Sequence, residues 1–208
     1  MNKKKVSKFY LFMKRTFDFT ASLLALIVLS PLFLVIAPLV KLSSKGPVFY
    51  VHERVGQYGK KLRIYKFRSM RCDYEKLEDI LTPEQLKEYQ TDFKVTNDPR
   101  ITKIGKFLRR TSLDELPQLI NIIKGNMSIV GPRPVLMEET YKYGENRDLF
   151  LSVKPGLTGH WQVSGRSNLS YPERIEMELY YIKNQSLWLD IKILFKTVFA
   201  VIFGLGAK

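Results

Sequence analysis

The sequence predicts an α+β protein that is mostly helical, with a membrane-inserted re-entrant helix at its N-terminus, a small β-hairpin and amphipathic interfacial helices. Three observations support this fold class. An apolar stretch at residues 19–40 contains a Ser-Pro step, β-prone segments at residues 48–51 and 62–67 flank a glycine-containing turn, and apolar residues recur at helical spacing in residues 101–108 and 187–203. We expect residues 1–45 to anchor the chain in a membrane and residues 46–208 to form a cytosolic domain at its surface.

The apolar stretch at residues 19–40 contains 22 residues without a charge, enough for a helix to cross a hydrocarbon core of about 30 Å. Basic residues flank it on both sides: Lys14 and Arg15 before it, Lys41 and Lys45 after it. Both ends therefore prefer the cytoplasmic face. Pro31 bends a helix, and the Ser30 hydroxyl can bond a carbonyl group that the bend frees. We expect a re-entrant helix, with a kinked spanning helix and a buried soluble helix as alternatives.

Asp18 lies at the edge of this stretch. Lys14 and Arg15 precede it by four and three residues, a spacing at which side chains on one helix are neighbours. We expect Asp18 to pair with one of them.

The two β-prone segments are separated by Gly56 and Gly59, which indicates a hairpin. The second arm alternates basic and apolar residues, which places Arg63 and Lys66 or Arg68 on an exposed face. This face could bind an anion or simply be solvated.

An acidic segment follows, with seven acidic residues against two lysines in residues 73–92. Its Thr82-Pro83-Glu84-Gln85 sequence is a capping box with proline at the first helical position. We expect a peripheral, solvent-facing helix and assign it no functional role.

Asp114 and Glu115 are the only acidic residues between Pro99 and Met137, a segment with seven lysines and arginines. The sequence from Ser112 to Glu115 resembles a capping box, which would place both acids in the first turn of a helix running to about Lys124. Positive neighbours and a helix N-terminus both favour ionised carboxylates. Adjacent helical residues point about 100° apart, so we expect two different roles, such as nucleophile and metal ligand. A surface ion-pair cluster is the alternative.

Two glycine-containing loops follow. Residues 131–134, Gly-Pro-Arg-Pro, form a stiff loop in which Arg133 is preorganised to bind phosphate. Residues 156–166 contain Gly156, Gly159 and Gly165 and end in Arg166. This second loop could bring backbone N–H groups to an anion, or it could be a connector.

The C-terminal segment at residues 187–203 is apolar apart from Asp190, Lys192 and Lys196. Its apolar side chains share one helical face, as in a helix lying on a membrane surface. A core helix is the alternative.

The composition limits the partners and the metal chemistry. A net charge of +14 indicates an anionic partner, which could be nucleic acid, anionic lipid or a charged small molecule. The single cysteine, Cys72, cannot form an intramolecular disulfide, and two histidines are too few for a zinc site. We therefore expect a cytosolic domain in which any metal ion is bound by oxygen.

The motifs together resemble the bacterial sugar transferase family, the monotopic polyprenyl-phosphate phosphoglycosyl transferases, in their small catalytic-unit form. The matching segments are Lys14-Arg15, Ser30-Pro31, Tyr65-Lys66-Phe67-Arg68-Ser69-Met70, Ser112-Leu113-Asp114-Glu115-Leu116-Pro117-Gln118-Leu119, Gly125-Asn126-Met127-Ser128, Gly131-Pro132-Arg133-Pro134 and Pro155-Gly156-Leu157-Thr158-Gly159. They occur in the expected order and cover nearly the whole chain.

The resemblance implies transfer of a sugar 1-phosphate from a UDP-sugar to undecaprenyl phosphate with release of UMP. It implies a ping-pong mechanism, a covalent Asp114 intermediate, Mg²⁺ at Asp114 and Glu115, and a place in capsule, exopolysaccharide or glycoconjugate synthesis. Substrate contacts are expected from five basic residues: Lys66, Arg68, Arg109, Arg133 and Arg166. The anchor is expected from Lys14, Arg15, Ser30 and Pro31.

The expected location is the cytoplasmic face of the bacterial inner membrane, among anionic lipids and without nucleic acid. The motifs predict neither the sugar nor the oligomeric state. A non-enzymatic, membrane-anchored polybasic adaptor that binds anionic lipid or nucleic acid is the alternative function.

Overall fold

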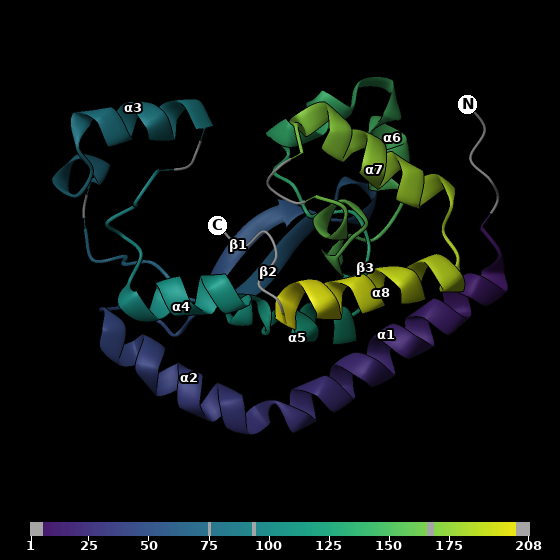
Figure 1. Cartoon of the computed structure of the whole chain (residues 1–208), viewed down its shortest axis with the longest axis horizontal. Helices are drawn as coiled ribbons and strands as arrows, with labels where there is room; N and C mark the ends of the chain where they lie inside the picture. The colour runs from purple at the N-terminus through teal and green to yellow at the C-terminus, as the bar shows by residue number, and fades with distance from the viewer. Residues whose placement is uncertain (1–5, 75, 93–94, 166–168, 203–208) are drawn as a thin grey trace.

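The N-terminal region of the computed structural model is a pair of helices joined at a bend (Figure 1). The structure describes residues 6–74, 76–92, 95–165 and 169–202. Helix α1 (Lys8–Val28) and helix α2 (Ser30–Ser43) are bent by 64° about Leu29. The Ser30 hydroxyl donates to the Ile27 carbonyl at 2.7 Å, so the predicted Ser-Pro break and its hydrogen bond are confirmed.

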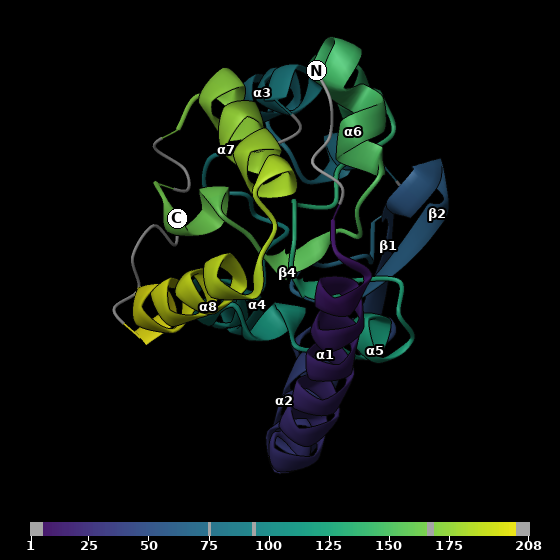
Figure 2. The ribbon, with the colours of Figure 1, turned by 90° about the vertical axis from the view of Figure 1, so that its right-hand side faces the viewer.

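In the described residues, no single helix is long and apolar enough to cross a membrane, whereas α1 and α2 together meet that test of length and composition. Both helices expose large apolar side chains, for example Phe12 (67%), Leu24 (62%) and Leu34 (76%). In Figures 1 and 2, the bend of this pair lies at the bottom of the view, below α4 (Lys103–Thr111) and α8 (Leu187–Ile202).

The predicted hairpin is present, with strands β1 (Phe49–Val55) and β2 (Lys61–Phe67) paired antiparallel around a 3₁₀ turn, η1 (Gln57–Gly59). Leu62 and Ile64 pack in a core with Leu119 and Ile122 of α5 (Gln118–Ile123). Arg63 is exposed, but the expectation that Arg68 could share its face is wrong, because Arg68 is 3% exposed. Its guanidinium donates to the carbonyls of Val40, Ser44 and Pro47, which ties the end of α2 to the hairpin.

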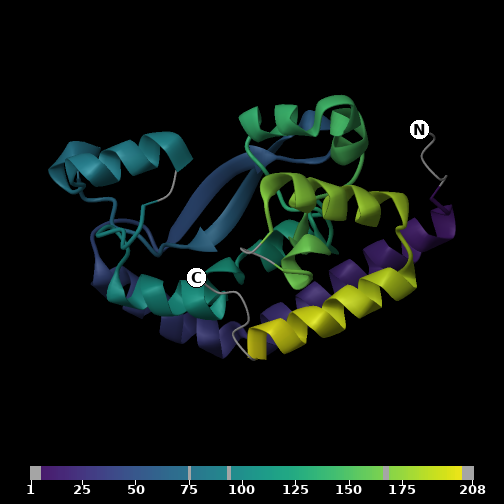
Figure 3. The same ribbon diagram turned by 45° about the horizontal axis from the view of Figure 1, so that its top comes forward.

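The acidic segment forms a short 3₁₀ turn, η2 (Leu77–Asp79), and helix α3 (Pro83–Asp92). The Gln85 N–H donates to the Thr82 hydroxyl oxygen at 3.3 Å, and the Gln85 side chain accepts from the Thr82 N–H at 3.2 Å. The capping box is therefore confirmed. Figures 1 and 3 show α3 standing apart from the body of the molecule, as a peripheral helix should.

The central segment consists of helix α4 (Lys103–Thr111), a 3₁₀ turn η3 (Leu113–Glu115), helix α5 (Gln118–Ile123) and strand β3 (Ser128–Val130). Strand β4 (Gly156–Thr158) pairs parallel to β3. The loop predicted over residues 156–166 is thus partly a strand. The Gly156 N–H donates to the Pro132 carbonyl at 2.8 Å, which removes it as an anion ligand.

The remaining elements form the second half of the core. They are η4 (Glu138–Asn146), α6 (Arg147–Leu151), η5 (Trp161–Val163), α7 (Tyr171–Lys183) and α8 (Leu187–Ile202). Helix α8 buries Ile193 but exposes Trp188 and Phe195, each at 75%. It therefore presents a solvent-facing apolar surface, as the interfacial prediction requires and a core helix would not.

Helix α1 docks on this body through its polar side chains. The expected pairing of Asp18 with Lys14 or Arg15 is wrong, because each of the three has a partner far along the chain. Lys14 bonds Asp190 of α8 at 2.9 Å, and Asp18 accepts from the Ile129 N–H at 3.0 Å. Arg15 donates to the carbonyls of Ile122 and Ile123 at 2.6 and 2.7 Å. The charged groups of Lys14 and Arg15 therefore bind partners within the protein.

Candidate active site

Asp114 and Glu115 lie in the 3₁₀ turn η3, between α4 and α5. Helix α4 ends at Thr111 and its C-cap is Ser112, whose φ of 57° is left-handed, whereas an N-cap residue has extended backbone. The Ser112 side chain makes no capping bond, and α5 begins only after Pro117. The expected single helix starting at Ser112 is therefore wrong, and the two acids occupy a separate turn.

Asp114 is 8% exposed, and burial raises the pKa of its carboxyl to about 6. Lys66 and Arg109 lower this pKa and Glu115 raises it, but the loss of solvation is the largest effect. The positive neighbours therefore do not bring the pKa of Asp114 below its ordinary value, as their charge alone would, but a carboxyl with a pKa of about 6 is still mostly ionised at pH 7. A carboxylate that is poorly solvated is a stronger nucleophile once it is ionised.

Glu115 differs from its neighbour in exposure and partner. Its side chain is 33% exposed, and Oε1 accepts a hydrogen bond from Lys66 Nζ at 2.6 Å. Lys66 lies on β2, opposite Tyr50 of β1. The hairpin thus supplies a fixed cation to the acid pair.

Two further contacts fix the turn to its surroundings. The Asn121 amide on α5 donates to the Arg63 carbonyl at 2.6 Å and accepts from the Tyr65 N–H at 3.1 Å. Asn121 therefore joins α5 to β2, because its side chain bonds the backbone at the edge of β2 in the way that a neighbouring strand would. Arg109 on α4 donates from Nε to the Ser69 hydroxyl at 2.8 Å, and this side of the turn is fixed as well.

Helix α4 also lies against the backbone of Ser69. A Cβ atom at Gly105 would lie 1.9 Å from the Ser69 carbonyl oxygen, so only glycine allows this approach. The Thr102 hydroxyl caps α4 by accepting from the Gly105 N–H at 2.9 Å. Close helix packing thus places Arg109 beside Asp114.

A second group of charged residues begins on β1. Arg54 bonds Glu139 at 3.1 Å and lies 3.4 Å from Nδ1 of His52. The pKa of His52 is lowered to about 4, mainly by burial and also by the charges of Arg54, Lys66 and Arg133. His52 is therefore neutral at pH 7 and lies within electrostatic range of both Lys66 and Arg133.

Arg133 is held by its backbone and leaves its guanidinium exposed. Its N–H donates to Glu178 at 3.1 Å, and its guanidinium lies 5.8 Å from the ring centroid of Trp161. Arg174 lies over the same ring at 4.6 Å, and its Nε and Nη2 are buried with no hydrogen-bond partner in the described residues. The Arg133 loop is thus supported by a buried aromatic and ionic cluster.

The structure places the predicted site residues in three groups. Asp114, Glu115, Lys66 and Arg109 are brought together, and Arg133 lies within electrostatic range of the same His52 as Lys66. Arg68 instead holds backbone carbonyls at the end of α2. Arg166 lies outside the described residues.

Sequence reasoning missed His52, Arg54 and Asn121. The alternation of Tyr50, His52 and Arg54 on the strand paired with Lys66 is a signal that could have identified the first two.

Magnesium ions are usually held by one or two carboxylates together with water and substrate phosphates. Asp114 and Glu115 fit this pattern, since they are adjacent and Glu115 is partly exposed. Among the described residues there is no group of three or more acidic, histidine or cysteine side chains that could enclose a metal ion. Any magnesium here would therefore depend on substrate oxygens for much of its coordination.

The comparison with known proteins gives a consistent result. Residues 9–204 match the family described as bacterial sugar transferase. The chain is 48% identical over 199 residues to an undecaprenyl-phosphate galactose phosphotransferase of Salmonella typhimurium, covering 94% of this chain and 42% of that protein. It is 46% identical over 197 residues to exopolysaccharide production protein ExoY of Sinorhizobium fredii, covering 93% and 87%.

A third relative is the UDP-glucose:undecaprenyl-phosphate glucose-1-phosphate transferase of Escherichia coli, which is 43% identical over 195 residues. That match covers 90% of this chain and 39% of the relative. The chain thus spans about two fifths of the Salmonella and Escherichia proteins and most of ExoY. From the extent of the family match and these identities, the chain is a member of the bacterial sugar transferase family.

Proposed function

We propose that this protein transfers a sugar 1-phosphate from a UDP-sugar to undecaprenyl phosphate, as the first membrane step of exopolysaccharide, capsule or glycoconjugate synthesis. The observation that supports this most is the buried Asp114 carboxyl with Lys66 and Arg109 around it. The names of the relatives, which act on undecaprenyl phosphate and galactose or glucose phosphates, support the substrate class.

In the first step, an Asp114 carboxylate oxygen attacks the phosphorus that carries the sugar. A bond forms between Asp114 and phosphorus, and the bond from phosphorus to the oxygen of UMP breaks, so that UMP leaves with both bonding electrons. Lys66 and Arg109 stabilise the negative charge on the phosphoryl oxygens and favour the ionised nucleophile. Deprotonation of Asp114 precedes this attack, because its pKa is about 6.

In the second step, a phosphate oxygen of undecaprenyl phosphate attacks the same phosphorus. The bond from phosphorus to Asp114 breaks, and the carboxylate is regenerated as undecaprenyl diphospho-sugar forms. UMP leaves before the lipid phosphate attacks, so ping-pong kinetics are expected. Asp114 thus accepts the sugar phosphate from the UDP-sugar and then passes it to the lipid phosphate.

The proposed magnesium ion would be held by Asp114 and Glu115 and would neutralise phosphate charge. Lys66 already holds Glu115 at 2.6 Å, which keeps that carboxylate oriented before the donor binds. We propose that Arg133, which is exposed and lies 5.8 Å from the Trp161 ring centroid, binds the nucleotide phosphates.

We further propose that the chain lies on the cytoplasmic face of the membrane, with α1 and α2 inserted as a re-entrant pair and α8 at the interface. The exposed apolar side chains of α1, α2 and α8 support this arrangement. It would bring Asp114 close to the plane of the lipid phosphate, because α2 packs against Leu113 and Leu116, the residues on either side of the acid pair.

The covalent step can be tested by intact mass. Purified protein with Mg²⁺ and a panel of UDP-sugars should gain the mass of one sugar phosphate and release UMP. Asp114→Asn should gain none, whereas Asp148→Asn, at an exposed position, should behave as wild type. Absence of an adduct with every donor, together with no UMP release in the presence of undecaprenyl phosphate, would instead favour the non-enzymatic adaptor.

A further inference from the structure

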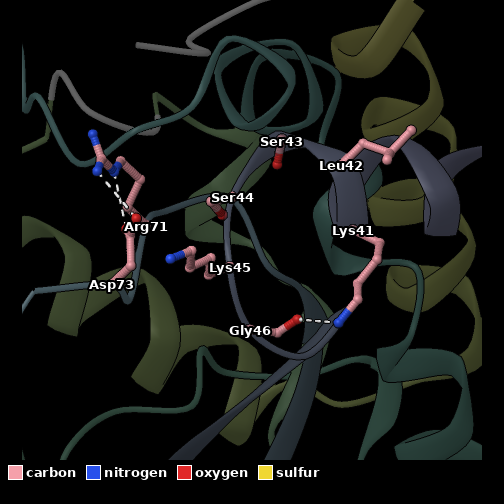
Figure 4. A pocket seen from close by; sticks show the side chains of 8 residues that line it. All are labelled: Lys41, Leu42, Ser43, Ser44, Lys45, Gly46, Arg71 and Asp73. Atoms are coloured by element: carbon pink, nitrogen blue, oxygen red, sulfur yellow. Dashed lines mark hydrogen bonds and ion pairs between the residues drawn. The ribbon is translucent and has the colours of Figure 1, made fainter.

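A pocket of about 620 Å³ lies at the C-terminal end of α2 (Figure 4). Its lining comes from the end of α2, the loop after it and the segment after β2: Lys41, Leu42, Ser43, Ser44, Lys45, Gly46, Arg71 and Asp73. None of these residues belongs to the Asp114 site. The lining contains three basic side chains and one acidic side chain, so the pocket carries a net charge of about +2 if all four groups are ionised at pH 7.

Several side chains that line the pocket have hydrogen-bond donors without a partner among the described residues. Arg71 bonds Asp73 through Nε and Nη2 at 2.9 and 3.1 Å, which leaves Nη1 available. Lys45 makes no hydrogen bond or ion pair to the described part of the chain, and Figure 4 shows its ammonium group directed toward Arg71 and Asp73. The Ser44 hydroxyl is buried without a partner among the described residues. A buried, unpaired hydroxyl carries a free-energy cost that a ligand can remove.

The end of a helix normally repels an anion, because its last carbonyls carry partial negative charge. Here the Arg68 guanidinium offsets part of that charge, because it donates to the carbonyl of Val40 in the last turn of α2 and to that of Ser44 just after the helix. The pocket is therefore electrostatically suited to an anion despite its position.

An apolar stripe on α2 leads to this pocket. Val35, Leu39 and Leu42 are spaced by four and three residues, which places them on one helical face. They are 57%, 43% and 84% exposed, and Leu42 also lines the pocket. The stripe spans eight residues, or about 10 Å of helix from Val35 to Leu42. A chain lying along it would have its polar end at Lys45 and Arg71.

We propose that this pocket binds the phosphate group of a membrane lipid whose hydrocarbon chain lies along α2. The inference rests on the membrane placement given above for α1 and α2. An anionic phospholipid and an isoprenyl phosphate share this chemistry. Either would fix the depth of α2, and Arg68 would transmit that position to the hairpin that carries Lys66.

Binding can be measured by native mass spectrometry on the full chain in a neutral detergent. The probes are dioctanoyl phosphatidylglycerol, farnesyl phosphate and inorganic phosphate. At least one lipid phosphate should bind more than tenfold more tightly than inorganic phosphate. The double variant Lys45→Ala/Arg71→Ala should weaken lipid binding by about tenfold, and Asp73→Asn should strengthen it, because each changes the charge beside the phosphate.

The matched control is Lys60→Ala/Lys61→Ala, which removes the same charge from the exposed turn of the hairpin and should change binding by less than twofold. Preference for farnesyl phosphate that is lost in Lys45→Ala/Arg71→Ala would assign the pocket to the acceptor lipid, and equal binding of both lipids would assign it to lipid phosphates in general. The inference is wrong if the double variant binds as wild type, if the control loses as much, or if inorganic phosphate binds equally well.

The proposed lipid pocket and the proposed function can each fail without the other in these experiments. Asp114→Asn should bind dioctanoyl phosphatidylglycerol as wild type, since Asp114 does not line the pocket and this lipid takes no part in the proposed reaction. Activity surviving in that variant would overturn the proposed mechanism and leave the pocket standing. Unchanged lipid binding in Lys45→Ala/Arg71→Ala would overturn the pocket proposal and leave the proposed mechanism standing.

Discussion

At the scale of single residues, the two adjacent acids are made different by burial. Asp114 is enclosed and is costly to ionise, whereas Glu115 is partly solvated and paired with Lys66. Charge counting along the sequence predicted ionisation of both acids. It could not predict which acid the fold buries, because burial depends on the left-handed end of α4 and the separate 3₁₀ turn.

The raised pKa of Asp114 gives a prediction for stability. A carboxyl whose pKa is higher in the folded protein than in the unfolded chain binds its proton more tightly when folded. The ionised group therefore destabilises the fold above about pH 6, and this penalty disappears below about pH 4. Asp114→Asn should raise the free energy of unfolding at pH 7.5 by about 1–3 kcal/mol, and the gain should fall as the pH is lowered from 6 to 4.

Denaturant unfolding in neutral detergent without metal, at several pH values, measures this effect. Asp148→Asn removes a charge at an exposed position and should change stability by less than about 0.5 kcal/mol at any pH. A loss of stability in Asp114→Asn at pH 7.5 would show that the ion pairs outweigh the burial of the carboxylate.

At the scale of elements, the sequence predicted what local patterns determine. The Ser30-Pro31 break, the hairpin around Gly59 and the capping box at Thr82 all follow from neighbouring residues. The pairing of β3 with β4 joins strands 28 residues apart in register, and Asn121 completes the edge of β2 from a helix. Such contacts are set by tertiary packing, which short-range patterns do not encode.

The approach of α4 to Ser69 gives a second prediction, at the level of this element. In Gly105→Ala, the new methyl group would overlap the Ser69 carbonyl oxygen, so α4 must shift and carry Arg109 with it. We expect a loss of about 1–3 kcal/mol in the free energy of unfolding and a lower kcat in the UMP-release assay. Gly56→Ala is the control, because its nearest neighbours would lie 3.3 Å from the new Cβ. Equal losses of stability and kcat in Gly105→Ala and Gly56→Ala would mean that the contact between α4 and Ser69 has no special role.

At the scale of the whole molecule, the N-terminal helices are structural parts of the body as well as a proposed anchor. Val40 of α2 packs with Phe67 and Leu108, and Leu113 and Leu116 on either side of the acid pair pack against this cluster. Charge patterning assigned Lys14 and Arg15 to the membrane flank, but their partners come from residues more than 100 positions away. No pattern local to α1 could have indicated those contacts.

The buried contact between Lys14 and Asp190 allows the coupling of α1 to α8 to be measured. The two side chains are 14% and 10% exposed, and Asp190 also accepts hydrogen bonds from Tyr10 and Tyr181 at 2.9 and 2.7 Å. Removing one partner leaves the other charge buried without its counter-ion, so Lys14→Met and Asp190→Asn should each lower the free energy of unfolding by about 3–5 kcal/mol.

The double variant should lose less than the sum of the two single variants, by about 1–3 kcal/mol. Denaturant unfolding of the four proteins completes the cycle. Lys8→Met, at an exposed position on the same helix, combined with Asp190→Asn is the control and should be additive. Because α1 and α8 together carry much of the exposed apolar surface, loss of their coupling should also weaken binding to anionic vesicles. Additive effects of Lys14→Met and Asp190→Asn would mean that the two helices reach the membrane independently.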